Sequence, residues 1–551
     1  MQENIKREPV LQMAQSANFD VPVLIVGGGP VGLAMVAELG WRGIDCTLVE
    51  QGDGEIVHPK TNGVNMRTME YCRRWGIADI IREKGYPKGR ARDHIYFTTL
   101  TGWEIARQVN PAYDEVTPPR GTLEPFQRCP QTVFDPALRD CARSFDSVTL
   151  RYRTRCLGVE QDEGGVTARL ESTDGAKQEE ALRAAYVVAC EGARSPIRDA
   201  LGIKLDGTPV LGYATNVLFR SAEFATMHDK GDGRSYLAMG PDGQWASVNA
   251  IDGKDLWRFQ IRGSLDPDSW GKVDVDSDLE RFAGRKFDYE VISVLDWIRR
   301  QLVADRYQDG RILLAGDCIH QLTPAGSFGM NTGIGDVTNL SWKIEAALRG
   351  WAGERLFESY TPERRPIGKR NVDYAAARYA RGEHVTPTPH ILEDSPEGAL
   401  ERAEVGERIM KEVLSPPNFG LQIGYRYDDS PIVWQEPGPP PPVERESYTP
   451  TTRPGARAPD ARLADGRPLI DLFGRGFVLL RLGASPPGAE TLAEAARRRG
   501  VPLQVIAIAD PEIAALYERP LVLVRPDGHV AWRGVDPPGD ALAVFDRVRG
   551  A

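Results

Sequence analysis

The strongest constraint on the fold is a glycine pattern that follows a short apolar run near the start of the chain. The run is Val23–Val26, and Gly27, Gly29 and Gly32 then form GxGxxG before a predicted helix and a second predicted strand, CTLVE, that ends at Glu50. A continuous apolar run is typical of a strand buried on both faces. The three glycines permit a tight turn, close approach of a pyrophosphate and close packing of the helix. The segment therefore predicts a dinucleotide-binding unit.

The residues around this turn narrow the choice of dinucleotide. Glu50, followed by Gln51, places a carboxylate where the two ribose hydroxyls of an adenosine would lie, and a 2′-phosphate would be repelled there. The helix that opens with Pro30 and Val31 adds free N–H groups and a partial positive charge for the phosphates. FAD or NAD is expected at this position, and NADP is disfavoured.

A second glycine-rich passage follows another buried strand much later in the chain. Ile312–Ala315 is the predicted strand, and Asp317 at its end can accept hydrogen bonds from a chain of hydroxyl groups. The small residues that follow let the backbone lie flat against a planar ligand. A helix is expected from near Gly333 to Gly350, with apolar residues at helical spacing: Val337, Leu340, Ile344 and Leu348.

With a third stretch, VVACEGARSPIR at 187–198, these motifs resemble the class A flavoprotein aromatic hydroxylases, the family of para-hydroxybenzoate hydroxylase and phenol hydroxylase. The resemblance covers about the first 380 residues. It rests on the GxGxxG turn, on Glu191-Gly192 in the middle motif and on Gly316-Asp317. Glu191 stands where the family usually has Asp, which keeps a carboxylate on a side chain one methylene longer.

The resemblance implies an α/β fold with three parts. They are a Rossmann-like FAD-binding domain of the glutathione-reductase (GR2) type, an antiparallel-sheet substrate domain and a C-terminal thioredoxin-like α/β domain. Alternating strand-like segments separated by Asp-Gly turns support the middle part, and a proline-rich stretch reads as a linker. The expected division is 1–201 for the first part of the FAD-binding domain, 202–300 for the substrate-binding sheet, 301–414 for the second part with a helical segment, 415–462 for the linker and 463–551 for the thioredoxin-like domain. This last unit contains no cysteine, which excludes thiol–disulfide chemistry there.

The resemblance also nominates cofactor contacts residue by residue. FQRCPQTVFDPALRD supplies Arg128 and Gln131, and HPKTNGVNMRTMEY supplies Lys60 and Arg67. The full expected set is Gly27, Gly29, Pro30, Val31, Gly32, Glu50, Gln51, Lys60, Arg67, Arg128, Gln131, Glu191, Gly192, Gly316, Asp317, Pro324, Gly326, Gly329, Met330 and Asn331.

Substrate contacts are less well defined. Asn62 matches a position at which some phenol hydroxylases carry a histidine that deprotonates the phenol, and an amide cannot act as a base. No catalytic residue is therefore assigned, and His320 is expected to be structural. Asn62, Tyr236 and Trp245 are the candidate substrate contacts, although aromatic residues of a sheet are more often ordinary core.

The reaction that the resemblance implies is hydroxylation of a phenolic or other electron-rich aromatic ring. NADPH or NADH would reduce FAD, O2 would give a hydroperoxide at the flavin C4a carbon, and the ring would take its distal oxygen. Alternatives are the same fold acting on a bulky polycyclic or antibiotic-like substrate, Baeyer–Villiger insertion, or a nitrophenol that releases nitrite. A non-catalytic FAD-binding scaffold is a further alternative.

Composition excludes several other classes of function. The net charge of -10 disfavours nucleic-acid binding, and we find no apolar run long enough to span a membrane. The seven cysteines show no CxxC spacing, which predicts scattered thiols in a cytoplasmic protein and no metal site. The first twenty residues are expected to be a polar tail without a signal peptide. A homodimer is common among the relatives implied by the resemblance, and the sequence leaves the oligomeric state open.

Overall fold

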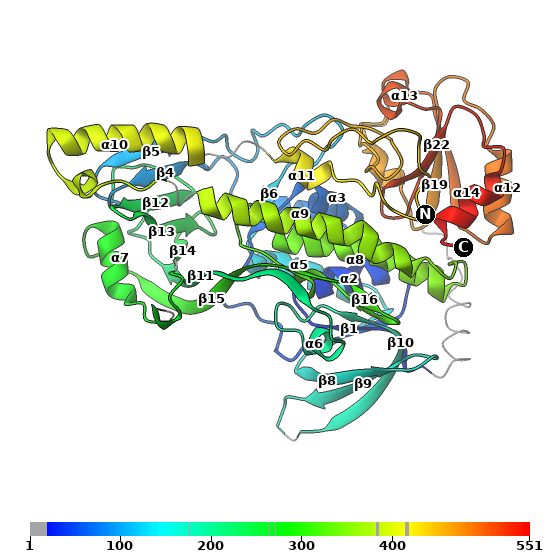
Figure 1. Ribbon diagram of the computed structural model, residues 1–551, viewed down its shortest axis with the longest axis horizontal. Helices are drawn as coiled ribbons and strands as arrows, with labels where there is room; N and C mark the ends of the chain where they lie inside the picture. The colour runs from blue at the N-terminus through cyan, green and yellow to red at the C-terminus, as the bar shows by residue number, and fades with distance from the viewer. Residues whose placement is uncertain (1–18, 176, 263, 270, 382–384, 414–417) are drawn as a thin grey trace.

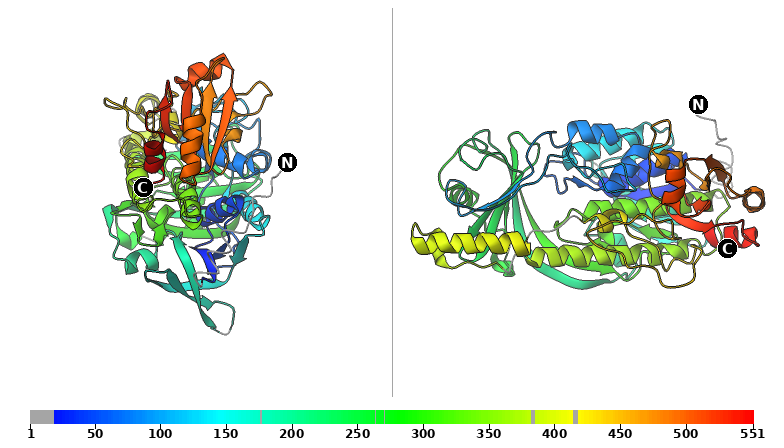
Figure 2. Two further views of the ribbon diagram at one scale, coloured as in Figure 1. Left: turned by 90° about the vertical axis from the view of Figure 1, so that its right-hand side faces the viewer. Right: turned by 90° about the horizontal axis from the view of Figure 1, so that it is seen from above.

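The computed structural model describes residues 19–175, 177–262, 264–269, 271–381, 385–413 and 418–551. Nearly all of the expected polar tail lies outside these ranges. In Figures 1 and 2 the molecule is elongated, with an antiparallel sheet at one end, a small α/β domain at the other and a mainly parallel sheet between them. The expected α/β fold with these three parts is confirmed.

The central sheet carries all three motifs. Its strands lie in the order β16 (Gln308–Asp309), β17 (Ile312–Leu314), β10 (Glu179–Ala189), β1 (Val21–Val26), β2 (Cys46–Val49) and β7 (Val148–Arg151), with β8 (Thr154–Gln161) and β9 (Val166–Ser172) attached to β10. β1 runs parallel to both β2 and β10, and β17 runs parallel to β10. The carboxyl ends of β1, β10 and β17 therefore meet at one edge.

Helices cover this sheet and fix the turns at its edge. The main ones are α2 (Pro30–Arg42), α5 (Gln131–Arg143), α8 (Gly329–Leu348) and α9 (Tyr360–Arg381), and shorter ones are α3 (Met66–Arg74), α4 (Ala78–Lys84) and α6 (Pro196–Ala200). α2 begins at a proline and ends at Gly43, whose φ of 70° suits glycine. α8 begins at Gly329, earlier than the expected Gly333, because the GMNTG segment forms its first turn.

The second sheet has eight strands and draws on more of the chain than the expected 202–300. Its order is β18 (His320–Gln321), β15 (Glu290–Ala304), β11 (Leu205–Arg220), β14 (Leu256–Ile261), β13 (Gly243–Ala250), β12 (Ser235–Gly240), β4 (His94–Phe97) and β5 (Glu104–Gln108). β4 and β5 come from the chain between the first two motifs, and β4 pairs in parallel with β12. Helix α7 (Val275–Ala283) packs its Leu279 and Phe282 into the apolar cluster on one face. Part of the opposite face is covered by apolar residues of 385–409, which pack on Tyr96, Leu237 and Met239.

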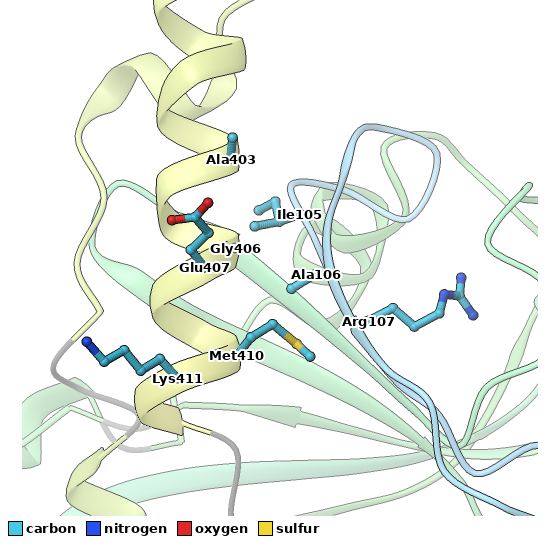
Figure 3. Close-up of a pocket in the computed structure, with 8 residues that line it drawn as sticks. All are labelled: Ile105, Ala106, Arg107, Ala403, Gly406, Glu407, Met410 and Lys411. Carbon is cyan, nitrogen blue, oxygen red and sulfur yellow. The ribbon is translucent and has the colours of Figure 1, made fainter.

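Helix α10 (Pro396–Arg408) covers the outer edge strand β5. Gly406 permits the close approach, because a Cβ atom there would lie 2.5 Å from the carbonyl oxygen of Ile105. A small hollow remains between the two elements (Figure 3), lined by Ile105, Ala106, Arg107, Ala403, Gly406, Glu407, Met410 and Lys411. An edge strand covered in this way cannot pair with another chain.

The C-terminal domain is a four-stranded sheet in the order β20 (Leu503–Ile508), β19 (Phe477–Leu482), β21 (Leu521–Val524) and β22 (Val530–Gly534), with α12 (Glu490–Arg498), α13 (Pro511–Tyr517) and α14 (Ala541–Val548). It begins before the expected residue 463. Arg457 is buried, and the Gly455 N–H donates to the Val530 carbonyl at 2.8 Å, so the end of the expected linker belongs to this domain. Among the described residues, no helix is long and apolar enough to cross a membrane.

Candidate active site

The three sequence motifs come together at the carboxyl edge of the central sheet. The Cys190 N–H donates to the Val26 carbonyl at 2.7 Å, and the Ala315 N–H donates to the Ala189 carbonyl at 3.0 Å. A Cβ atom at Gly27 would lie 2.4 Å from the carbonyl oxygen of Cys190. Residues hundreds of positions apart in the chain therefore line one short edge.

The glycines at this edge fall into two kinds. Gly27 has a φ of 110°, and a Cβ atom at Gly32 would lie 1.9 Å from the Gly27 carbonyl oxygen, so both glycines are required by the protein itself. A Cβ atom at Gly29 would meet nothing within 4 Å, and neither would one at Gly192, although the φ of 81° at Gly192 still favours glycine. Open space beside the N-terminus of α2 is what a bound pyrophosphate needs. The edge therefore fits a dinucleotide.

Glu50 lies beside this turn, as expected for a residue that binds a ribose. One carboxylate oxygen accepts from the Gly28 N–H at 2.7 Å and the other accepts from the Gly52 N–H at 2.8 Å. These bonds hold the half-buried carboxylate in one orientation. Gln51, the next residue, is exposed.

Asp317 ends the third motif in an unusual setting. Its side chain is accessible to solvent, but the protein around it disfavours the charged form and so raises its pKa. The positive charges of His320 and Lys60 act in the opposite direction and lower the pKa. Exposure and dense surroundings together describe a carboxylate that faces an open space enclosed by protein. Gly316, with a φ of 72°, makes this turn possible.

Behind Asp317, a buried cluster anchors the turn to helix α8. His320 Nε2 lies 2.7 Å from Asp336 Oδ2, the Arg364 Nε–H donates to Asp336 Oδ1 at 2.8 Å, and the Gly316 N–H donates to Asp336 Oδ2 at 3.2 Å. Burial would raise the pKa of Asp336, but His320 and Arg364 hold it below its ordinary value. His320 therefore helps Asp336 to hold the turn in place.

Several nominated residues hold the loops around the edge. Asn331 Nδ2 donates to the Gly63 carbonyl at 2.9 Å, its Oδ1 accepts from the Asn65 N–H at 3.0 Å, and Gln131 Oε1 accepts from the Lys60 N–H at 2.9 Å. These bonds tie the start of α8 and the start of α5 to the segment 60–65. Beside them, Met330 is buried, Pro324 is exposed and Gly326 adopts a φ of 89°.

Arg128 ends β6, Asn62 directly precedes β3, and the two side chains are hydrogen-bonded. Gly63–Val64 (β3) pairs with Gln127–Arg128 (β6), and an Arg128 Nη1–H donates to Asn62 Oδ1. The Arg128 Nε–H donates to the Tyr113 hydroxyl at 3.0 Å. The amide of Asn62 is thus occupied by an arginine.

Two nominated cofactor contacts have other partners. Arg67 is buried and donates to the Glu70 carboxylate at 2.8 Å and to the Asp527 carbonyl at 2.6 Å. Because Asp527 belongs to the C-terminal domain, Arg67 links that domain to the FAD-binding domain. Glu191 accepts from the Ser195 hydroxyl at 2.5 Å and from the Ile197 N–H at 3.3 Å, because its extra methylene lets it reach the start of α6. We leave the side chains of both out of the cofactor site proposed below.

The two aromatic substrate candidates lie on the α7 side of the second sheet. The Tyr236 hydroxyl donates to the Gly231 carbonyl at 2.9 Å and accepts from the Gly233 N–H at 3.0 Å, and its ring packs against Phe224. Trp245 lies beneath the guanidinium of Arg281 in α7, 4.0 Å from the ring centroid. Tyr236 is buried in the core and Trp245 is partly buried against it, so we leave both out of the substrate site proposed below.

The opposite face of the second sheet carries polar residues that the sequence analysis missed. Register places one residue from each of six neighbouring strands in a single row, called here the polar row, which contains Leu218 and five polar residues: Ser293, Arg258, Asn249, Ser235 and His94. His58, close to Asn62 in the chain, joins this row through a 2.9 Å contact between its Nδ1 and Ser293 Oγ. Alternation with buried Trp257 and Phe259 is the sequence signal that could have identified Arg258.

Comparison with known proteins places this geometry in a family. The model of an FAD-binding domain matches residues 20–375, and the model of the aromatic-ring hydroxylase C-terminal domain matches residues 451–551. The chain belongs to the FAD-binding aromatic-ring hydroxylase family.

Individual relatives cover nearly the whole chain. A putative polyketide hydroxylase from Streptomyces halstedii is 32% identical over 94% of this chain and 94% of its own length. The 4-methyl-5-nitrocatechol 5-monooxygenase of a Burkholderia species is 31% identical over 96% of each chain. Among solved structures, RebC with bound 7-carboxy-K252c matches with a TM-score of 0.87 at 37% identity, over 97% of this chain and 99% of that one. A ternary complex of aklavinone-11 hydroxylase with FAD and aklavinone matches with a TM-score of 0.79 at 28% identity, over 97% and 99%.

Family membership defines the class of enzyme and its cofactor. The protein is an FAD-dependent monooxygenase, FAD is its cofactor, and NADPH or NADH is the reductant typical of the family. Within the part of the chain that the structure describes, no group of three or more His, Cys, Asp or Glu side chains could hold a metal ion. All seven cysteines are free thiols.

Proposed function

We propose that this monooxygenase hydroxylates a bulky polycyclic aromatic compound that carries a phenolic ring. The supporting observation is the width of the polar row on the second sheet. The row crosses six neighbouring strands, β15 to β4. At about 4.8 Å between strands this is roughly 24 Å, several times the width of a benzene ring. A single-ring phenol would span only a small part of this row.

The cofactor in this proposal lies along the carboxyl edge of the central sheet. Gly27, Gly29 and Gly32 admit its pyrophosphate, Glu50 binds the adenosine ribose, and Asp317 accepts hydrogen bonds from the ribityl chain. Backbone of Gly316, Gly192, Gly326 and Gly329, together with Pro324, Met330 and Asn331, would line the flavin. Arg128, Gln131 and Lys60 hold the neighbouring loops. When bound, FAD supplies oxygen activation, and the chain orients the ring and excludes water.

The relatives support a large substrate. RebC was solved with 7-carboxy-K252c and aklavinone-11 hydroxylase with aklavinone, and the Streptomyces halstedii relative is described as a polyketide hydroxylase. These three similar proteins differ in the compound they handle, so they support the class of substrate and leave its identity open.

The test is oxidation of NADPH and NADH by the purified holoenzyme in the presence of polycyclic phenols and of single-ring phenols. We expect polycyclic phenols to stimulate oxidation, and mass spectrometry under ¹⁸O₂ should show one labelled oxygen atom in the product. Stimulation by single-ring phenols alone would contradict the proposal.

A nitrocatechol is the second candidate substrate, because one relative is a nitrocatechol monooxygenase at 31% identity. The same assay distinguishes the two. Nitrite released in step with NADPH consumption from a nitrocatechol, without turnover of polycyclic phenols, would favour this candidate.

A further inference from the structure

The turn between β21 and β22, residues 525–529, reaches from the C-terminal domain to the start of helix α3. An Arg67 Nη2–H in the first turn of α3 donates to the Asp527 carbonyl at 2.6 Å. The turn is closed by the Gly528 N–H, which donates to the Arg525 carbonyl at 2.9 Å. A Cβ atom at Gly528 would lie 3.0 Å from an Arg67 nitrogen. The Arg67 guanidinium is thus in close contact with a closed turn of another domain.

Arg67 lies beside the N-cap of α3, and this cap is bonded to helix α8. The N-cap residue is Asn65, whose Oδ1 accepts from the Thr68 N–H at 2.8 Å. The Asn65 N–H donates to Asn331 Oδ1 near the start of α8 at 3.0 Å. Arg67 is 6% exposed, Asn65 8% and Asn331 6%, so water competes little for these bonds. The contact with the C-terminal domain is therefore two residues away from a buried bond to α8.

Asn331 in turn holds a residue with an unfavourable backbone conformation. Ser327, two residues before α8, has a φ of 60°, a left-handed conformation that is disfavoured for a residue with a side chain. Asn331 Nδ2 donates to the Ser327 carbonyl at 2.6 Å and to the Gly63 carbonyl at 2.9 Å. A Cβ atom at Gly63 would lie 2.6 Å from the Ser327 Cβ. Such a conformation persists where the surrounding contacts fix it, and here Asn331 and Gly63 do so.

The loop that contains Ser327 lies beside the end of the third motif. A Cβ atom at Gly329, the first residue of α8, would lie 3.9 Å from a carboxylate oxygen of Asp317. The loop is therefore part of the edge at which the cofactor is proposed to bind. The path from the Asp527 carbonyl to this edge passes through Arg67, Asn65, Asn331 and Ser327.

We propose that Arg67 is a positioning residue for FAD, through which the C-terminal domain fixes the loop at the start of α8. The free N–H groups and partial positive charge of this helix end stabilise the negative charge of reduced flavin more than they stabilise neutral oxidised flavin. A loop that is free to relax would weaken this stabilisation. The inference rests on the cofactor position proposed above and is independent of the substrate. It gives the C-terminal domain a part in setting the reduction potential of the flavin.

The test compares R67Q with R73Q in the purified holoenzyme. Arg73 is the matched control, because it lies near the other end of α3 and pairs with Asp471 of the C-terminal domain at 2.6 Å. Both variants therefore remove a contact between α3 and that domain, but only R67Q removes it beside the N-cap. Binding of FAD to the apoprotein is measured by flavin fluorescence, and the midpoint potential is measured by reduction in the presence of a reference dye.

R67Q should weaken binding of oxidised FAD by about threefold and of reduced FAD by about tenfold. The ratio of about three is the size of effect that a helix terminus has on a nearby charge. For a two-electron couple it makes the midpoint potential about 15 mV more negative. R73Q should leave both dissociation constants and the potential unchanged.

Two outcomes would overturn the role of Arg67. One is a wild-type potential in R67Q. The other is an equal shift in R73Q, because the effect would then come from a general loosening of the C-terminal domain. Should R67Q fail to fold, R67K is measured by the same criteria. Lysine keeps a cation beside Glu70 but lacks the planar fork that also reaches the Asp527 carbonyl, so the potential should still shift.

Ser327 provides an independent test of the path. Glycine adopts a φ of 60° without strain, so the loop in S327G needs less support from Asn331. The double variant R67Q/S327G should therefore recover at least half of the shift in potential. A double variant that keeps the full shift of R67Q would contradict transmission through this loop.

The positioning role and the cofactor site fail separately. Weak FAD binding in G29A together with a wild-type potential in R67Q would leave the proposed cofactor site standing and remove the role of Arg67. Normal FAD binding in G29A would remove the site itself.

Discussion

A methyl group added at Gly29 or at Gly32 meets different surroundings, although the two glycines are three residues apart. At Gly29 it would meet no protein atom within 4 Å, and the φ of -73° there suits alanine. At Gly32 it would lie 1.9 Å from a backbone oxygen. We expect G29A to fold normally but to bind FAD at least about tenfold more weakly, because its methyl enters the space for the pyrophosphate.

G32A is the comparison variant and should lose stability, because the clash forces the helix away from the strand. Flavin fluorescence after dialysis measures FAD retention, and thermal unfolding of both apoproteins measures stability. Normal FAD affinity in G29A would show that the pyrophosphate lies elsewhere.

Asp135 predicts a pH dependence of stability. It is 3% exposed, one carboxylate oxygen has no partner, and the other accepts from Gln131 at 2.8 Å. Burial raises its pKa to about 7, against the influence of Gln131, Arg139 and Lys60. Because the folded-state pKa exceeds the unfolded value of about 3.9, the contribution to stability is full at low pH and is lost as pH rises toward about 7.

We therefore expect D135N to be increasingly stabilised relative to the wild type as pH rises from about 5 to about 8. Urea unfolding at three pH values measures this difference. A difference that is independent of pH would show that Asp135 is already ionised in the folded protein.

At the scale of elements, helix α8 depends on one buried carboxylate. Asp336 holds the Gly316 turn, His320 and Arg364 together, and all of these contacts are buried. D336N would leave Arg364 without its counter-charge, which typically costs about 3–5 kcal/mol. Urea unfolding should show this loss, and FAD should bind more weakly because the Gly316 turn loosens.

The control for this prediction is D373N on α9, where Asp373 pairs with Lys369 at the surface. That substitution should change stability by less than about 1 kcal/mol. An equal loss of stability in the two variants would show that Asp336 contributes no more to stability than a surface carboxylate does.

Elements with a local sequence signature could be predicted, and those that depend on distant partners could not. The GxGxxG turn and β17 could be predicted because apolar runs and glycines within a few residues indicate them. That they lie on the same sheet was implied by the family resemblance. Arg67 matched a family segment, but its partner Asp527 is 460 residues away. Strand alternation shows that Arg258 and Trp257 lie on opposite faces, and only the packing of α7 shows which face is core.

The whole molecule is joined by a buried charge network between the C-terminal domain and helices α8 and α9. Glu363 accepts from Arg525 at 2.6 Å and from Lys343 at 2.8 Å, and Arg525 also pairs with Asp527 at 2.6 Å. The cations outweigh the effect of burial and hold the pKa of Glu363 well below its usual range. The C-terminal domain is thus fixed to the helix that begins beside the cofactor edge.

We expect E363Q to lower the free energy of unfolding by about 3–5 kcal/mol, since buried Lys343 loses its carboxylate partner and Arg525 keeps only Asp527. E494Q is the control, because Glu494 pairs with Arg497 on the exposed face of α12 and should change stability by less than about 0.5 kcal/mol. Calorimetry of the wild type should show one unfolding transition. Two separate transitions would show that the C-terminal domain unfolds independently.

The cofactor edge also has a consequence for biosynthesis. Its three strands end at Val26, Ala189 and Leu314, and the helix that closes it ends at Leu348. A growing polypeptide therefore cannot form the complete edge until well over half of it has left the ribosome. Until then β10 lacks its neighbour β17, and unpaired apolar strands are prone to aggregate. Flavin supply during translation should therefore matter less for the early folding of this protein than protection by chaperones.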